Sequence, residues 1–236
     1  MKLAIMQPYF LPYLGYFSLI KHSDKWIFND EVQMINKGWV ERNRILKQYG
    51  GWHYIRVPLV KYHHTTSIKD IKIRNEEPWK EKILAQLGHY KRKAPHYYKV
   101  IRFLKEAFQE EFDTITAQNA HLLQRSCEYV GFKMEYQILS EMNVDLKGIK
   151  EPDDWSLHIC QELGYDHYLN PIMGKSFYNP EKYEAGGVHL NFLRLQETPY
   201  KQLDNNVFIG GLSIVDHMMF NTPEEINRML DKYRLE

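Results

Sequence analysis

The first thirty residues constrain the fold more than any other stretch of the chain. An apolar run, Leu3–Met6, is followed by an aromatic segment with two prolines, residues 7–17, and then by a second predicted strand, Lys25–Phe28. The prolines fix two backbone φ angles and prevent a helix between them, so we expect a short helix only over residues 16–21. The pattern predicts strand, loop, helix and strand, the unit that forms parallel strand pairs with right-handed crossovers.

The remaining chain alternates between apolar runs and helical periodicity. Trp79, Ile83, Leu87 and Tyr90 recur at helical spacing and open a helical segment at about residues 77–131. Further strands are expected over residues 53–59, 68–73, 134–139, 167–170 and 188–193. Further helices are expected over residues 154–163, 213–220 and 224–233. We therefore predict a single α/β domain over residues 1–236, with a Rossmann-like, mixed and partly parallel sheet and flanking helices.

Composition disfavours several classes of protein. No apolar run approaches the roughly 20 residues of a membrane span, and the apolar start of the chain is too short for a signal peptide. Cys127 and Cys160 lack the spacing of a zinc site or a redox pair, and the adjacent His63 and His64 are a weak indication of a metal site. We expect a cytoplasmic protein without a metal. No motif identifies a cofactor, which stays unknown at this point.

Charge and aromatic residues favour an anionic ligand with a flat ring. Residues 56–105 hold thirteen lysine or arginine residues and four acidic ones, although the whole chain has a net charge of only +1. A nucleotide pyrophosphate, an anionic lipid surface or an RNA would suit this asymmetry, and so would a solvated helix face. The 17 tyrosines and 5 tryptophans suit a pocket for a sugar or a base, although ordinary core positions account for most of them.

Polar side chains follow the first two predicted strands. Ligands of open parallel sheets bind at the carboxyl ends of strands, so Gln7 and Asp30 are our candidate catalytic residues. A carboxylate there can orient or deprotonate a ligand amine, and an amide can position it. The alternative for Asp30 is an Asx turn or a helix cap.

Aromatic and basic residues nearby are candidate substrate-binding residues. The alternative for the aromatic loop is a rigid hydrophobic plug, and the alternative for residues 39–43 is a surface strand. Arginine can hold a phosphate in a fork and tryptophan can stack on a ring. The candidates in this part of the chain are Tyr9, Tyr13, Tyr16, Trp39, Arg42 and Asn43.

Several of these motifs together resemble the WbqC-like protein family. The resemblance rests on residues 5–17, 28–33 and 38–45, on Tyr90 with Ala94-Pro95, and on residues 199–202 and 212–216. It spans nearly the whole chain and adds Gln202 and Asp216 to the candidate substrate-binding residues. The family is bacterial and is associated with enzymes that build surface polysaccharides such as O-antigen. The resemblance implies transfer of an amino acid, glycine, to an amino sugar.

The resemblance therefore implies a transferase that acts on an amino sugar, and a nucleotide-activated form of that sugar would suit the basic segment and the aromatic residues. The enzyme would transfer an aminoacyl or acyl group to the sugar amine, with an aminoacyl-tRNA as one candidate donor. A nucleotidyltransferase that forms an adenylate from ATP is an alternative, but Tyr13 and Tyr16 stand where the histidines of class I synthetases would stand. A non-catalytic adaptor of a glycan pathway is the third hypothesis. The expected partner is a nucleotide-linked sugar or another anionic small molecule.

Overall fold

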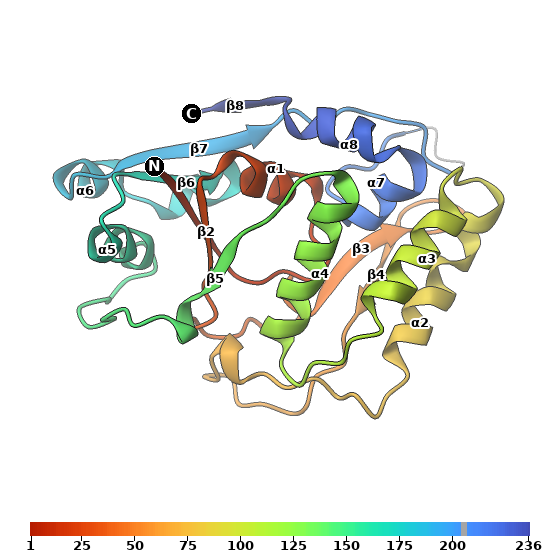
Figure 1. Ribbon diagram of the computed structural model, residues 1–236, viewed down its shortest axis with the longest axis horizontal. Helices are drawn as coiled ribbons and strands as arrows, with labels where there is room; N and C mark the ends of the chain where they lie inside the picture. Colours follow the sequence, from red (N-terminus) through yellow and green to blue (C-terminus); the bar gives the residue numbers. More distant parts are fainter. Residues whose placement is uncertain (204–206) are drawn as a thin grey trace.

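A six-stranded sheet organises the fold in the computed structural model, which describes residues 1–203 and 207–236. The strand order is β5-β2-β1-β6-β7-β8 (Figure 1). Neighbouring strands run parallel from β5 to β7, and β8 is antiparallel to β7. The strands are β1 (Lys2–Met6), β2 (Lys25–Phe28), β5 (Tyr136–Ile138), β6 (His167–Pro171), β7 (His189–Leu195) and β8 (Tyr233–Leu235). The predicted α/β fold with a mixed, partly parallel sheet is confirmed.

The first strand-loop-helix-strand unit forms as the sequence predicts. β1 pairs in parallel with β2, and α1 (Leu14–His22) connects the two strands. Along β1, Leu3 and Ile5 pack into one hydrophobic cluster and Ala4 packs into another. Successive side chains of a strand point to opposite faces, so β1 is buried on both sides of the sheet. This double burial explains why residues 3–6 form an uninterrupted apolar run.

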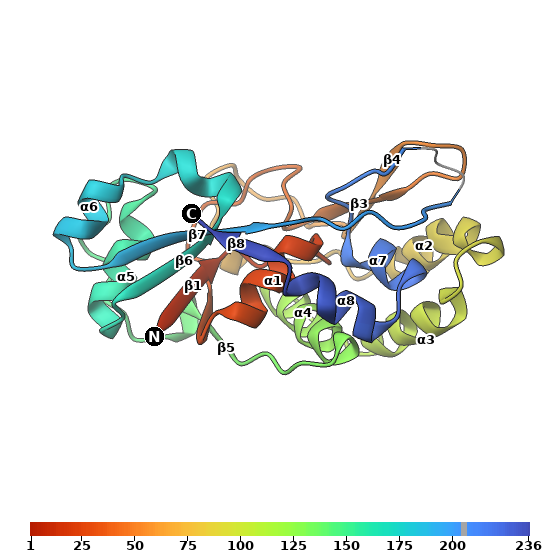
Figure 2. The same ribbon diagram turned by 90° about the horizontal axis from the view of Figure 1, so that it is seen from above.

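Helices cover both faces of the sheet (Figure 2). α5 (Asp154–Leu163) packs against the face that carries Leu3 and Ile5, together with α6 (Pro180–Ala185). α1 packs against the opposite face and contacts α8 (Pro223–Leu230). The sheet is therefore the middle layer of a three-layer arrangement, so the helices cover its two faces and not the ends of its strands.

An antiparallel hairpin and the helical segment extend the larger hydrophobic cluster away from the sheet. The hairpin pairs β3 (Arg42–Leu46) with β4 (Trp52–Arg56). The other helices are α2 (Trp79–Gln86), α3 (Tyr97–Ala107), α4 (Ile115–Val130) and α7 (Ile214–Phe220), with short 3-10 helices η1 (Ile68–Asp70), η2 (Leu87–Arg92), η3 (Leu139–Glu141) and η4 (Ile172–Phe177). Gly131 ends α4 with φ 98°, in the left-handed region that glycine adopts without strain. No helix among the described residues has the length and apolar character needed to cross a lipid bilayer.

Three local predictions differ from the structure. The predicted strand over residues 68–73 is the turn η1 followed by isolated bridges, because its backbone groups bond to several separate segments. The last predicted helix stops at Leu230, and the residues that follow form β8. α6, which begins at Pro180, was not predicted because a helix of six residues shows little periodicity.

Candidate functional site

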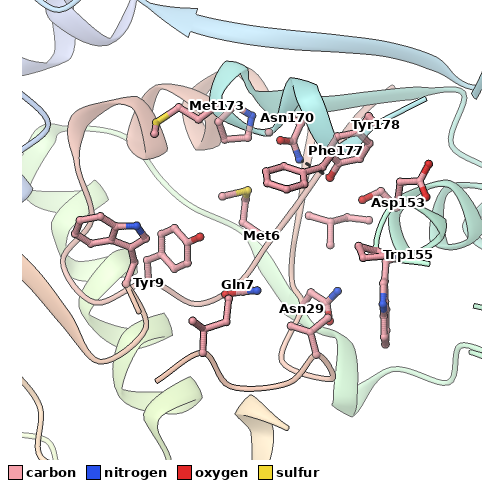
Figure 3. A pocket seen from close by; sticks show the side chains of 18 of the residues that line it. Met6, Gln7, Tyr9, Asn29, Asp153, Trp155, Asn170, Met173, Phe177 and Tyr178 are labelled. Atoms are coloured by element: carbon pink, nitrogen blue, oxygen red, sulfur yellow. Dashed lines mark hydrogen bonds between the residues drawn. The ribbon is translucent and has the colours of Figure 1, made fainter. Parts of the chain in front are cut away.

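A cavity of about 930 Å³ opens at the edge of the sheet where β1, β2 and β6 end. Gln7 follows β1, Asn29 follows β2 and Asn170 lies near the end of β6. Three carboxamides therefore face the cavity from adjacent parallel strands (Figure 3). The other walls come from the loop before β3, the loop before α5 and the 3-10 helix η4. This carboxyl-end edge is where open parallel sheets bind their ligands.

Aromatic side chains form much of the cavity wall. They come from four separate parts of the chain: Tyr9, Tyr13, Trp39, Trp155, Phe177 and Tyr178. Burial, with smaller effects from Tyr9 and Glu197, raises the pKa of Tyr13 to about 12. Its phenol therefore stays protonated at neutral pH and can donate a hydrogen bond. Such walls stack on flat rings and pack against the apolar faces of sugars.

The acidic residues at the cavity pair with lysines outside it, and Lys182 is shared between Glu151, Asp153 and the neighbouring Asp154. Glu31 lies 2.7 Å from the Lys69 ammonium, and Asp153 lies 2.9 Å from Lys182. Among the described residues, neither Arg44 nor Lys150 forms an ion pair, although both line the cavity. These two unpaired cations are the groups at the cavity wall that could bind an anionic group of a ligand.

Arg44 is held in place by contacts that leave its charge available. Its Nη2 atom donates to the Gly211 carbonyl at 2.7 Å. The guanidinium carbon lies 5.4 Å from the ring centroid of Trp39 and 5.1 Å from that of Trp52. Cation–π contacts of this kind orient a guanidinium without neutralising it.

Two buried asparagines fix the aromatic loop between β1 and α1. The Nδ2 atom of Asn119, on α4, donates to the carbonyls of Pro8 and Val40, both at 2.8 Å. Asn43, on β3, donates to the carbonyl of Phe10 at 3.0 Å. Both side chains satisfy backbone groups that face away from solvent, so they determine where the loop meets the hairpin.

The same loop is also fixed near its two ends. Ser213, which caps α7, donates to the carbonyl of Leu11 at 2.7 Å. Leu11 has φ 40°, a conformation that is unusual for a bulky residue and needs support from its surroundings. The hydroxyl of Tyr16 donates to the carbonyl of Gln7 at 2.7 Å. Tyr16 is buried and does not line the cavity, so it positions the backbone of Gln7.

Half of the predicted site residues line the cavity and half lie elsewhere. The residues that line it are Gln7, Tyr9, Tyr13, Trp39 and Asn43. The residues outside the lining are Asp30, Tyr16, Arg42, Gln202 and Asp216. Arg42 instead lies over the ring of Tyr54, with the guanidinium carbon 3.8 Å from the ring centroid.

Asp30 connects β2 to the turn after β5. Its carboxylate accepts hydrogen bonds from the backbone N–H of Ser140 at 3.1 Å and from the Ser140 hydroxyl at 2.7 Å. Burial raises the pKa of Asp30, and the two bonds from Ser140 oppose that rise. A carboxylate with both oxygens engaged is poorly placed to take a proton from a ligand in the cavity. Its catalytic role stays a prediction that this geometry does not favour.

Gln202 and Asp216 belong to a separate buried network. The hydroxyls of Tyr90 and Tyr200 each donate to the Asp216 carboxylate at 2.6 Å, and Gln202 Nε2 lies 3.4 Å away. Tyr90 also accepts the backbone N–H of Leu46 at 2.9 Å. Burial raises the pKa of Asp216 to about 6, and the three donors oppose that rise. Through Tyr90 and Asp216, this network links β3 of the hairpin to α7.

Several residues of the cavity were not among the predicted site residues. Asn29 and Asn170 could have been found, because each stands at or near the end of a predicted strand. Arg44, Lys150 and Trp155 carry no comparable sequence signal. None of the basic residues in 56–105 belongs to the described lining, and Lys69 acts at the cavity wall only through its ion pair with Glu31.

The fold and the cavity define an α/β protein with a cavity at the carboxyl ends of its parallel strands. The chain belongs to the WbqC-like protein family, whose model matches residues 7–228. It is 26% identical over 227 residues to the uncharacterized protein Rv1507c of Mycobacterium tuberculosis, with 95% of each chain covered. No solved structure matches the chain significantly.

Proposed function

We propose that this protein is a cytoplasmic transferase that acylates the amine of a nucleotide-activated amino sugar during surface-polysaccharide synthesis. The cavity is the observation that supports this proposal. Its volume of about 930 Å³ lies within the range of small-molecule sites, roughly 300–1,000 Å³. Aromatic walls suit a base and a sugar ring, neutral carboxamides suit sugar substituents, and Arg44 with Lys150 suits a diphosphate.

The proposed reaction is acyl transfer from an activated ester to the sugar amine. The amine nitrogen attacks the ester carbonyl, a C–N bond forms, and the C–O bond to the donor alcohol breaks. The alcohol oxygen leaves with the electron pair and takes up the proton that the amine loses. Glycine is the acyl group that the family resemblance implies, and an aminoacyl-tRNA is a donor with the required ester.

The cavity residues divide between anchoring and positioning in this proposal. Arg44 and Lys150 bind the diphosphate, and Tyr9 and Trp39 pack against the rings of the nucleotide and the sugar. Gln7 positions the sugar, and Tyr16 holds the backbone of Gln7 in place. Since these groups act by orientation, their main contribution is to align the amine with the donor carbonyl.

The test combines a reaction with a matched pair of arginine variants. Purified protein is incubated with a UDP-linked amino sugar and glycyl-tRNA, and the product is identified by mass spectrometry. Arg44→Gln removes the cavity charge and keeps a polar carboxamide at this position. Arg42→Gln, two residues away on the same strand, removes a charge that lies outside the cavity lining.

We expect glycine incorporation by the wild type and by Arg42→Gln. A lost charge-assisted hydrogen bond corresponds to about 10- to 150-fold weaker binding of the nucleotide sugar by Arg44→Gln. Absence of a glycylated product with every nucleotide amino sugar and donor tested would count against the transferase. Equal effects of the two substitutions would show that Arg44 does not bind the ligand.

A further inference from the structure

The carboxamides of Gln7 and Asn29 are neighbours in the lining of the cavity. β1 and β2 pair so that Met6 lies opposite Phe28, and the backbone N–H of Asn29 donates to the Met6 carbonyl at 2.9 Å. The next residue of each strand therefore stands at the same level of the sheet edge. Figure 3 shows the two side chains next to each other below Met6. Adjacent strands are about 4.8 Å apart, a spacing that lets two side chains bind one small group.

Neither carboxamide is used to hold the protein together. Gln7 and Asn29 form no side-chain hydrogen bond with any residue in the described part of the chain, although the backbone of each is bonded. Asn29 is only 6% exposed, and its Oδ1 atom has no partner there. A buried amide left unpaired costs stability, and at the wall of a cavity a ligand group can supply the missing partner.

Other carboxamides around the cavity differ in this respect. Asn119 and Asn43 donate to backbone carbonyls of the aromatic loop. Asn170 donates to the hydroxyls of Tyr168 and Tyr178, at 2.7 and 2.9 Å. Gln7 and Asn29 are therefore the two carboxamides at these strand ends whose hydrogen-bonding capacity is left for a ligand.

The chemistry of two neighbouring carboxamides selects the ligand group. Each presents an N–H donor and a carbonyl acceptor, and a rotation of the terminal amide exchanges the two. A phosphate or carboxylate offers only acceptors, and an ammonium offers only donors. A hydroxyl offers a donor and an acceptor on a single oxygen, whereas an amide offers them on two separate atoms, so an amide can reach both side chains at once.

We infer that Gln7 and Asn29 together bind an acylamino substituent of the sugar, with one accepting from its N–H and the other donating to its carbonyl. This inference rests on the proposed function and assigns a place within that cavity to the amide group. The bond that the proposed transfer forms is itself an amide. The pair therefore holds either a pre-existing acylamino group of the substrate or the newly formed one of the product.

The test compares two ligands that differ in one substituent. UDP-N-acetylglucosamine carries an acetamido group where UDP-glucose carries a hydroxyl, and both bring the same nucleotide and diphosphate. Isothermal titration calorimetry measures their dissociation constants without requiring turnover. Two neutral hydrogen bonds correspond to about 5- to 150-fold tighter binding of the acetamido sugar by the wild type. Asn29→Ala and Gln7→Ala should each reduce this preference, because each should weaken the binding of UDP-N-acetylglucosamine more than that of UDP-glucose.

Two further variants keep the result interpretable. Asn29→Asp preserves the shape of the side chain and removes its N–H donor, so it reports on recognition even if Asn29→Ala folds poorly. Gln137→Ala removes an exposed carboxamide from the neighbouring strand β5 and should keep the full preference.

The outcomes separate this inference from the proposed function. Equal affinity of the wild type for both sugars, or a preference that survives all the Asn29 and Gln7 substitutions, overturns the inference and leaves the transferase proposal intact. Failure of both UDP sugars to bind overturns the inference and also contradicts a nucleotide-sugar substrate. A preference that disappears in the Asn29 and Gln7 variants alone supports the assignment.

Discussion

Asn119 offers the sharpest test of how the cavity is built. It is fully buried in α4, and its one amide nitrogen bonds the carbonyls of both Pro8 and Val40 at 2.8 Å. Asn119→Leu replaces the amide with an apolar group of similar size and leaves two buried carbonyls without a donor. Each unpaired buried acceptor costs about 1–3 kcal/mol, so the free energy of unfolding should fall by about 2–6 kcal/mol.

The preceding residue provides a matched control. Gln118 is also a fully buried carboxamide in α4, but neither of its side-chain polar atoms has a partner among the described residues. Gln118→Leu removes polar groups that gain nothing from burial, so its effect should be neutral or stabilising. The two substitutions make the same kind of change at adjacent positions and differ in the hydrogen bonds that they remove.

Equilibrium unfolding in urea, followed by tryptophan fluorescence and circular dichroism, measures both effects. For a chain of this size each kcal/mol corresponds to about 2–4 °C in Tm, which thermal melting can check. Hydrogen exchange should also show faster exchange in residues 8–13 of Asn119→Leu, because that loop loses its anchor. If Asn119→Leu is no more destabilising than Gln118→Leu, Asn119 does not anchor the aromatic loop.

Three further predictions concern pH, packing and thiol reactivity. The pKa of Asp216 is about 6 in the folded protein and about 4 in the unfolded protein. Between pH 4 and 6 the folded state therefore binds more protons than the unfolded state. As the pH rises through this range, the Asp216 carboxyl lowers the free energy of unfolding by up to about 3 kcal/mol. Burial lowers the pKa of His217 to about 3, which has the opposite effect on stability, but this effect is the same in the wild type and in Asp216→Asn. The difference in unfolding free energy between the two proteins should therefore show the loss caused by Asp216 alone. A difference that does not change with pH would contradict this prediction. A Cβ at Gly174 would collide with the Asn170 amide oxygen, so Gly174→Ala should weaken nucleotide-sugar binding about tenfold or more. Gly88→Ala adds a methyl group into open space and should leave binding unchanged. Equal binding by the two variants would refute this prediction. Burial raises the pKa of the Cys127 thiol and raises that of Cys160 to about 12, so neither should react with Ellman's reagent within minutes unless urea unfolds the protein; fast labelling of the folded protein would refute their burial.

Local sequence patterns were sufficient for the elements that pack by periodicity. These local patterns are the apolar run of β1, the prolines after it and the helical spacing in α2, α3 and α4. Each can be recognised within a short stretch of sequence, because it shows which neighbouring residues are buried. The six residues of α6 and the edge strand β8 lie below that limit. β8 exists because its backbone pairs with β7, a partner about forty residues away, and no local pattern specifies such a pairing.

The candidate site shows the same division at single residues. Gln7 and Asn29 could be placed at strand ends from the sequence, because an apolar run must stop where its strand leaves the core. Asp30 directly follows Asn29, yet it faces away from the cavity lining, toward Ser140, 110 residues further along the chain. Arg42 and Arg44 are equally plausible ligands for an anion by sequence, and only Arg44 lines the cavity.

The sequence by itself determined the class of fold, the opening strand-loop-helix-strand unit and the family, because these depend on the order of apolar, aromatic and turn-forming residues along the chain. The tertiary structure decided which polar side chains share one cavity. That choice depends on strand register, on the side of the chain to which each residue points, and on partners such as Asn119 and Ser213 that close the aromatic loop from distant segments. A side chain's direction at a strand end reverses with each residue, so it is settled only when those distant segments pack.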